Sequence, residues 1–351
     1  MKKYIVLFFI IIFAFIQCSK NEPFSPLITS TGNSNLSDGR SMYNLYVLNT
    51  LSSNVSVVDL NSFEVNNTLF KAGKWANDLK IMDNKYLLVV NSGNNNVEIY
   101  NSETSNISYI FTPSSPEYIA VYNNSEFYLS VDGENKIVKY NIDGDILSEI
   151  SLPDTTSNPW KMKIYNNKLY IACYGTYYSW ANPNNFFDAS LIVVDIDDNS
   201  IEKIITGFTN LTDIDFYKNY IYAVATGQFN NTGKVYKIDI SDYSIDSVIS
   251  IGGSPGVISI NNYYNNIFIG DNGWSTSGLY LIKNDIIING TSSPLINSGI
   301  SAIIQDNESY LLSYIADFNA NKVYIYNNST LSKIKTFNNF SGPVALVLQK
   351  K

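Results

Sequence analysis

From residue 43 onward, hydrophobic and polar residues alternate in short runs rich in Val, Ile and Tyr, and Asn, Asp and Gly separate the runs. This alternation predicts half-buried β-strands joined by tight turns. One unit recurs: an apolar run, an Asn-centred turn, a second run, a polar loop, a third run and a weaker fourth. It begins as LKIMDNKYLLVVN, IAVYNNSEFYLSV, MKIYNNKLYIAC, IDFYKNYIYAV, ISINNYYNNIFIG and AIIQDNESYLLSYIAD. The chain is therefore expected to be all-β and repetitive.

The spacing of the turns indicates which repeat fold this is. The turn asparagines are Asn84, Asn124, Asn167, Asn219, Asn266 and Asn307, at spacings of 40, 43, 52, 47 and 41 residues. In the third runs, Val97, Ile137, Val235 and Val323 take the same place. A period near 40 with four strands per unit predicts the blades of a β-propeller.

The two ends of the repeat region complement each other. The first unit, from Tyr43, begins at a second strand, and residues 341–349, SGPVALVLQ, match the first-strand pattern with no blade after them. We therefore expect the C-terminal strand to complete the N-terminal blade. This gives a closed ring of seven blades over residues 43–351, which leaves no blade unpaired.

Three stretches of the repeat also resemble a known family. YVLNTLSSNVSVVDL at 46–60, LVVNSGNNNVEIYN at 88–101 and YIADFNANKVYIYN at 314–327 are similar to the repeat of the YVTN family of bacterial β-propellers. The resemblance implies the propeller fold over residues 43–349. It does not specify a function, because propellers host binding proteins, lyases, lactonases and redox enzymes alike.

The N-terminus has the layout of a secretory signal. Lys2 and Lys3 precede an apolar run at 4–16, which is too short to span a bilayer as a helix. Phe15-Ile16-Gln17-Cys18 resembles a bacterial lipobox, although Gln17 departs from the preferred small residue. We expect a signal peptide at 1–17, a lipidated Cys18 and a flexible tether over 18–42, with the domain exported and anchored to the cell envelope, periplasmic or surface-exposed. The alternative is cleavage elsewhere, with Cys18 lost.

Composition narrows the chemistry. The chain has no histidine, which excludes histidine-dependent triads and metal centres. Its net charge of −8 argues against a nucleic-acid partner. Besides Cys18 the only cysteine is Cys173, which is expected to be a buried strand residue rather than part of a disulfide. We assign no catalytic residue, metal ligand or cofactor.

The candidate binding residues gather on one side of the ring. In a four-stranded blade, the connections between blades and the loops between second and third strands share one face, called here the loop face. The longest insertions, 173–190, 226–233 and 270–278, belong to it. Exposed aromatics there would suit a protein or glycan partner. The candidates are Trp75, Trp160, Tyr177, Tyr178, Trp180, Phe186, Phe187, Phe229 and Trp274.

Several alternatives remain open. The 173–190 loop could pack its own aromatics over the channel mouth, and Trp75 and Trp160 are the better candidates for packing between blades. A second hypothesis is a hydrolase or lyase with a carboxylate or calcium centre in the channel, where Asp213 and Asp215 are closely spaced. A third is a redox partner protein. The acidic stretches 141–145 and 195–200 are expected to be turns rather than calcium loops.

Overall fold

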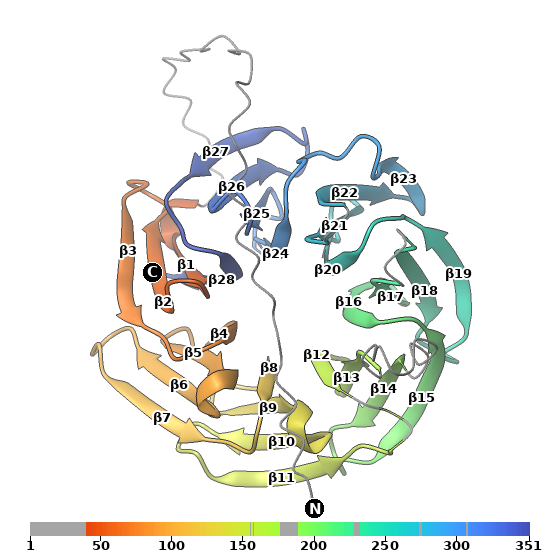
Figure 1. Cartoon of the computed structure of the whole chain (residues 1–351), viewed down its shortest axis with the longest axis horizontal. Helices are drawn as coiled ribbons and strands as arrows, with labels where there is room; N and C mark the ends of the chain where they lie inside the picture. The colour runs from red at the N-terminus through yellow and green to blue at the C-terminus, as the bar shows by residue number, and fades with distance from the viewer. Residues whose placement is uncertain are drawn as a thin grey trace, which may run out of the picture. The chain divides into compact units, whose positions relative to one another are not determined.

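The structure is a computed structural model, and it describes residues 40–154, 156, 158–175, 189–227, 232–273, 276–306 and 308–351. Within these residues, the unit Asp38–Lys351 contains seven four-stranded antiparallel sheets. The sheets stand as blades around a common centre (Figure 1). The predicted all-β, seven-bladed propeller is confirmed.

The strands of each blade are given from the innermost to the outermost. Blade 1 contains β28 (Pro343–Lys350), β1 (Tyr43–Asn49), β2 (Asn54–Asp59) and β3 (Val65–Lys71); blade 2 contains β4 (Ala76–Met82), β5 (Tyr86–Asn91), β6 (Asn96–Asn101) and β7 (Ile107–Phe111). Blade 3 contains β8 (Pro116–Val121), β9 (Glu126–Val131), β10 (Lys136–Asn141) and β11 (Ile146–Ser151); blade 4 contains β12 (Pro159–Tyr165), β13 (Lys168–Cys173), β14 (Ala189–Asp195) and β15 (Ile201–Phe208).

The remaining blades follow the same order. Blade 5 contains β16 (Leu211–Tyr217), β17 (Tyr220–Ala225), β18 (Lys234–Asp239) and β19 (Ile245–Ser250). Blade 6 contains β20 (Pro255–Asn261), β21 (Asn266–Asp271), β22 (Gly278–Lys283) and β23 (Ile286–Asn289). Blade 7 contains β24 (Ile300–Gln305), β25 (Leu312–Asp317), β26 (Lys322–Asn327) and β27 (Lys333–Phe337). Short 3-10 helices are η1 (Arg40–Met42), η2 (Ser92–Asn94) and η3 (Asp132–Glu134).

The ring closes as the sequence predicts. The C-terminal strand β28 is the innermost strand of blade 1 and pairs antiparallel with β1, from Tyr43↔Lys350 to Asn49↔Pro343. In Figure 1 the last strand, dark blue, lies beside the first, red. Blade 1 is thus assembled from both ends of the repeat region, and neither β1 nor β28 is left as a free sheet edge.

Hydrophobic residues on both faces of each blade build the core. Neighbouring blades share clusters such as Tyr170, Leu191, Ile214, Phe216 and Ile238 between blades 4 and 5. The matched third-strand residues Val97, Ile137, Val235 and Val323 are all 0 % exposed. Cys173, at the end of β13, is also fully buried, as predicted, and is a free thiol in the described part of the chain. The core is therefore a series of inter-blade layers rather than one central cluster.

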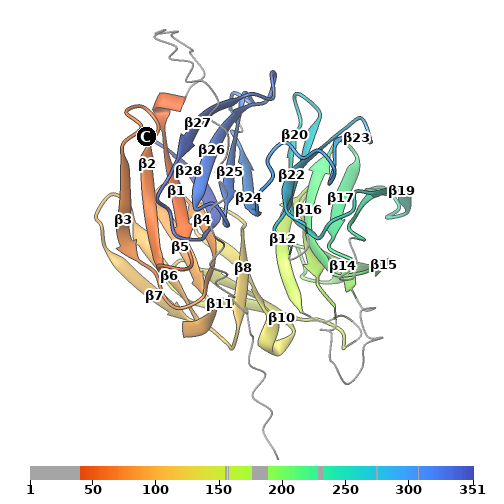
Figure 2. The same cartoon turned by 45° about the horizontal axis from the view of Figure 1, so that its top comes forward.

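The alternation of strand direction fixes the two faces of the ring. Each inner strand starts at the loop face and the blade's outer strand returns to it, so connections between blades and second-to-third-strand loops share that face (Figure 2). Most predicted turn asparagines lie in the first-to-second-strand turns on the opposite face, but Asn266 begins β21 and Asn307 lies outside the described residues. The stretches 141–145 and 195–200 join third to fourth strands, as expected of turns.

Several calls fall outside the described residues. These are the signal segment, Cys18 and the tether up to residue 39, together with most of the aromatic residues of the loop-face insertions. In the part of the chain that is described, no helix is long and apolar enough to cross a membrane.

Candidate binding face

Every inner strand is irregular near its first residues. The pairing of each inner strand with its blade's second strand shifts register there, at the loop-face end. Such a β-bulge inserts one extra residue into one strand and redirects the side chains around it. The bulged residues are Val344, Asn77, Glu117, Tyr118, Trp160, Lys161, Thr212, Gly256 and Ser301.

In blades 3 and 4 the register shift leaves two inner-strand residues opposite one residue of the second strand. In blade 3, Pro116 pairs with Val131 and Ile119 pairs with Leu129, so Glu117 and Tyr118 lie opposite the single residue Ser130. In blade 4, Trp160 and Lys161 lie opposite the single residue Ala172 in the same way. An acid, a lysine and two aromatic rings are thereby placed at the loop-face end of two neighbouring inner strands.

These residues connect blades 2 to 5 in one belt. Asn77 Nδ2 donates to Glu117 Oε2 at 2.5 Å. The rings of Tyr118 and Trp160 lie 5.0 Å apart, and Trp160 also contacts Tyr174 at 6.1 Å. We call Asn77, Glu117, Tyr118, Trp160, Lys161 and Asp213 the bulge belt.

The lysine of the belt joins its aromatic and acidic parts. Lys161 Nζ lies 5.7 Å from the centre of the Tyr118 ring and pairs with Asp213 Oδ2 at 2.9 Å. A cation over an aromatic face is attracted by the ring quadrupole. Lys161 is therefore fixed from both sides, by blade 3 and by blade 5.

Burial governs the electrostatics of the belt. Glu117 is 4 % exposed, and this burial, together with the charge of Asp132, raises its pKa to about 8, while hydrogen bonds from Asn77 and Ser92 oppose the change. Burial also raises the pKa of Asp132 to about 6. The pKa of Tyr118 is raised well above its ordinary value by burial and then by the charges of Glu117, Asp78 and Asp213. Glu117 is thus largely protonated near neutral pH.

The two acids singled out from sequence have structural partners. Asp213 Oδ2 accepts the backbone N–H of Ile258 at 3.2 Å, in addition to Lys161. Asp215 Oδ2 accepts the N–H of Ile260 at 2.7 Å, and its Oδ1 pairs with Lys163 at 2.7 Å. Both carboxylates therefore bind blade 6 to blade 5 and pair with lysines of blade 4.

Trp75 lies beside the belt on the connection from β3 to β4. It is 55 % exposed, so it does not pack between blades, which corrects one expectation. Its φ of 52° is left-handed. The residues that directly precede four other inner strands share this conformation: Ser115, Asn158, Asn210 and Gly342. Gly and Asn adopt this conformation most readily, whereas it is unfavourable for a bulky ring.

The structure tests the other predicted aromatics unequally. Trp160 is half-buried against Tyr118 and Tyr174 at the loop face. Outside the described residues lie Tyr177, Tyr178, Trp180, Phe186, Phe187, Phe229 and Trp274. Sequence reasoning missed Asn77, Glu117, Tyr118 and Lys161. The signal that could have found the last three is a polar or aromatic pair directly after a strand-opening proline, Pro116 or Pro159.

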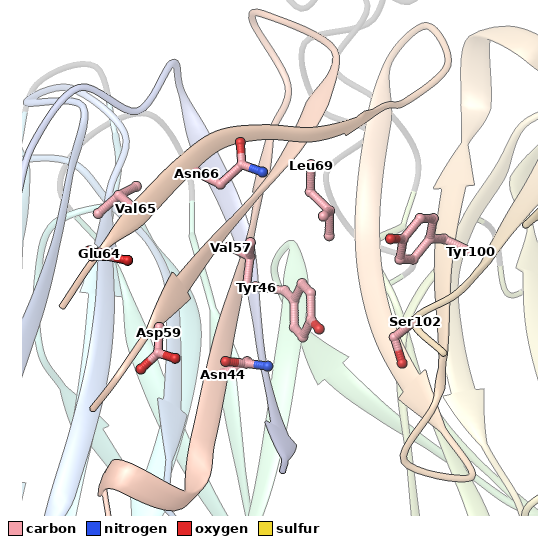
Figure 3. A pocket seen from close by; sticks show the side chains of 10 residues that line it. All are labelled: Asn44, Tyr46, Val57, Asp59, Glu64, Val65, Asn66, Leu69, Tyr100 and Ser102. Atoms are coloured by element: carbon pink, nitrogen blue, oxygen red, sulfur yellow. The ribbon is translucent and has the colours of Figure 1, made fainter. Parts of the chain in front are cut away.

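A cavity of about 390 Å³ opens between blades 1 and 2 on the opposite face. Figure 3 shows Tyr46, Leu69 and Tyr100 around it, from β1, β3 and β6. Several of its polar groups are already engaged: Tyr46 donates to Gln349, and Asp59 accepts from Lys351 and two backbone N–H groups. This cavity therefore has a structural explanation. Among the described residues, no group of three or more Cys, Asp or Glu side chains is placed to hold a metal ion.

Comparison with known proteins supports the fold. No family model matches the chain, and no curated protein matches it. A solved protein from Lactobacillus plantarum is similar over 88% of this chain and 99% of its own, with a TM-score of 0.66 and 10% identity. Virginiamycin B lyase from Staphylococcus aureus is similar over 77% of this chain and 87% of its own, with a TM-score of 0.58 and 14% identity.

A third similar structure is dihydro-heme d1 dehydrogenase NirN in complex with DHE. The similarity covers 88% of this chain and 75% of that one, with a TM-score of 0.60 and 10% identity. At such identities the likeness defines the class, a β-propeller, and nothing finer. The YVTN resemblance stays a prediction, and the neighbours, which include enzymes, do not decide whether this chain is one.

Proposed function

We propose that this chain is a non-catalytic binding or scaffold lipoprotein of the bacterial cell envelope, recognising a protein or glycan partner through the aromatic loop face. In this proposal a lipid on Cys18 attaches the chain to the membrane. Residues 18–42 then hold the ring away from the surface, because their Ser, Asn, Gly and Pro content is typical of a flexible linker.

The observation that carries the proposal is Trp75. An indole that is 55 % exposed gains little from folding, and its left-handed backbone costs about 1 kcal/mol that Asn or Gly would avoid. Left-handed residues also occur in ordinary turns of this chain, such as Phe63 and Tyr243, so the exposure of the ring carries more weight than its backbone. A large ring kept accessible at this cost is suited to bury against a partner, where aromatic residues contribute most to affinity.

The bulge belt supplies a rigid support next to this ring. Trp160 is held between Tyr118 and Tyr174, and Lys161 is fixed by Asp213. Binding surfaces on pre-ordered elements lose less entropy on association. The partner is therefore expected to contact Trp75 together with the long loops of blades 4 to 6 on the same face.

The site is tested with a chain in which Trp75, Trp180 and Trp274 are all replaced by Ala. Envelope extracts are passed over the immobilised full-length protein, and captured proteins and glycans are compared with those of the wild type. We expect the specific partner to be lost. Tyr263→Ala is the control, because Tyr263 is 71 % exposed on the β20–β21 turn of the opposite face. The site would be contradicted if the triple variant still captured the partner and Tyr263→Ala did not.

The anchor is tested separately through Cys18. Replacing Cys18 with Ser is expected to abolish metabolic labelling with a fatty-acid analogue and to move the protein from the membrane fraction to the soluble fraction. Membrane association that persists in the variant without label would contradict lipidation at this residue, while leaving the loop-face proposal intact.

One observation favours the alternative, a hydrolase or lyase with a carboxylate centre. Glu117, with its pKa raised to about 8, lies near Asp132, with its pKa raised to about 6. Two acids with separated pKa values are suited to general acid and base roles. Turnover of ester, lactone or uronate substrates that Glu117→Gln abolishes, with Glu103→Gln as control, would favour this alternative over a purely binding role.

A further inference from the structure

One structurally equivalent position differs in chemistry among the blades. In each blade, one residue of the third strand pairs with the last residue of the second strand. The position in question lies two residues further along the third strand. The seven occupants are Ser56, Glu98, Val138, Ile192, Tyr236, Tyr280 and Tyr324. All are buried. Glu98 is the only carboxylate among them.

Where tyrosine occupies this position in blades 6 and 7, its hydroxyl has an internal partner. Tyr280 donates to Asp271 at 2.7 Å and Tyr324 to Asp317 at 2.9 Å. In blade 2, Glu98 receives only a 3.3 Å hydrogen bond, from Asn91 to Oε2. Its Oε1 has no partner among the described residues, although the side chain is 2 % exposed. Leaving a buried acceptor unsatisfied is costly, so this oxygen requires an explanation.

Glu98 lines a cavity of about 400 Å³ between blades 1 and 2, at the loop-face end of the strands. Blade 1 contributes residues 71–73, and blade 2 contributes Asn91, Asn94, Asn96, Tyr109 and Phe111. Burial raises the pKa of Glu98 to about 7. Tyr109 is the cross-strand partner of Glu98 on β7, and the charge of Glu98 raises the pKa of Tyr109.

Two aromatic rings form an open wall of this cavity. Tyr109 is 53 % exposed and Phe111 80 % exposed, and both project from the outermost strand β7 on the same side as Ile107. Rings of this kind bury much area at low entropy cost against a flat apolar surface. The alternating C–H face of a pyranose is such a surface.

The polar groups of the cavity include both donors and acceptors. The side-chain nitrogens of Lys71, Asn94 and Asn96 make no side-chain hydrogen bond with any described residue. The unpartnered Oε1 of Glu98 supplies an acceptor. Sugar hydroxyls both donate and accept, so they match this mixture. A cationic ligand would use the acid and the rings, but Lys71 at the rim would repel it and the amide donors would stay unused.

We propose that the cavity between blades 1 and 2 binds a neutral sugar ring, which stacks on Tyr109 and Phe111 and donates a hydroxyl hydrogen bond to Glu98. This site uses other residues than the aromatic loop face, so it stands or falls independently of the function proposed above.

The test is a saturation-transfer NMR titration of the full-length chain. The probes are the methyl pyranosides of glucose, galactose and mannose, N-acetylglucosamine, and choline as a cationic comparison. We expect saturable binding of at least one sugar. Phe111→Ala is expected to weaken it by about tenfold or more, because it removes the stacking ring from an exposed position without disturbing the core.

Two further variants address Glu98 itself. Glu98→Gln keeps the size of the side chain but replaces one acceptor oxygen with a donor, and a loss of about tenfold is expected. Glu98→Tyr introduces the residue of blades 5 to 7, fills the cavity and is expected to abolish binding. Tyr263→Ala, which removes an exposed ring of the opposite face, should bind as the wild type does.

Three outcomes would overturn the proposal. No saturable binding of any sugar probe would exclude a neutral sugar site. Sugar binding that Phe111→Ala and Glu98→Gln leave unchanged would place the site elsewhere. Binding of choline but of no sugar, lost in Glu98→Gln, would reassign the cavity to cations.

Discussion

Tyr46 donates a hydrogen bond to Gln349 Oε1 at 2.5 Å, although 303 residues separate them in the chain. Tyr46 is on β1 and Gln349 on β28, so the bond crosses the junction between the two ends of the ring. The Nε2 of Gln349 continues the contact to blade 2, donating to Asn84 O and to Ser102 Oγ, both at 2.7 Å. One side chain near the C-terminus thus links the first strand of the chain to the next blade.

Deletion of residues 341–351 is therefore expected to destabilise the whole ring. The deletion removes the inner strand of blade 1, exposes the edge of β1 and opens the contact with β4. We expect a large fall in melting temperature and loss of a single cooperative transition in calorimetry. Deletion of Lys351 alone is the control, since that residue lies beyond β28 and makes an exposed ion pair with Asp59 and one backbone hydrogen bond, to Met42 O. An unchanged melting temperature for the larger deletion would contradict a role of closure in stability.

The ring could be predicted from sequence because its physical cause is periodic. Each blade buries both faces against neighbours, so every unit repeats the same apolar spacing, and Val97 and Val323 could be matched without coordinates. Closure could be predicted because the N-terminal unit lacks a first strand and the C-terminal segment is a strand with no blade after it. These inferences needed only patterns along the chain.

The site could be predicted only in part, because its geometry comes from irregularities. Glu117 and Tyr118 are adjacent, and together they interrupt the alternation of buried and exposed residues along the strand. In the sequence alone, such an interruption looks the same as a segment with low strand propensity. Glu98 alternates with Val97 and so reads as a solvent-facing residue of a half-buried strand. Blade 1 buries that face as well, which a pattern within one strand cannot reveal. Trp75 was found as an aromatic, but its exposure depends on a backbone angle.

Asp213→Ala is expected to lower the free energy of unfolding by about 3 to 5 kcal/mol. The variant leaves Lys161 and the backbone N–H of Ile258 without their partner in a largely buried setting. Glu134→Ala is a matched control, because its ion pair with Lys136 joins a side chain that is 45% exposed, and such pairs contribute less than about 1 kcal/mol. Denaturant unfolding of both variants measures the difference. Equal losses would mean that the blade 5–blade 6 contact does not depend on this carboxylate.

Stability is expected to fall as the pH rises from about 5 to 8, in part because of Glu117. Its pKa rises from 4.5 in the unfolded chain to about 8 in the fold. Between these two pKa values the folded protein keeps a proton that the unfolded chain has released. The stability that Glu117 contributes is therefore complete below the pKa of the unfolded chain, and it is lost as the pH rises through the pKa of the folded protein. For Glu117 the full contribution is on the order of 5 kcal/mol.

Glu117→Gln should flatten this pH dependence. The amide stays neutral at every pH and keeps the size of the side chain. Denaturant unfolding at several pH values between 5 and 8 is compared for the wild type, Glu117→Gln and the exposed control Glu103→Gln. A residual slope from Asp132 and Glu98, whose pKa values are also raised, is expected. A slope identical to the wild type in Glu117→Gln would show that this carboxyl is solvated in the folded protein.

Trp75→Asn separates binding from stability. Asparagine adopts the left-handed conformation readily, as Asn158 and Asn210 do at equivalent positions. We therefore expect the free energy of unfolding to stay constant or to rise by up to about 1 kcal/mol, while capture of the envelope partner declines. Trp160→Asn is the comparison: it removes ring contacts with Tyr118 and Tyr174 and should cost about 2 to 3 kcal/mol. If Trp75→Asn were as destabilising as Trp160→Asn, the Trp75 ring would serve the fold rather than a partner.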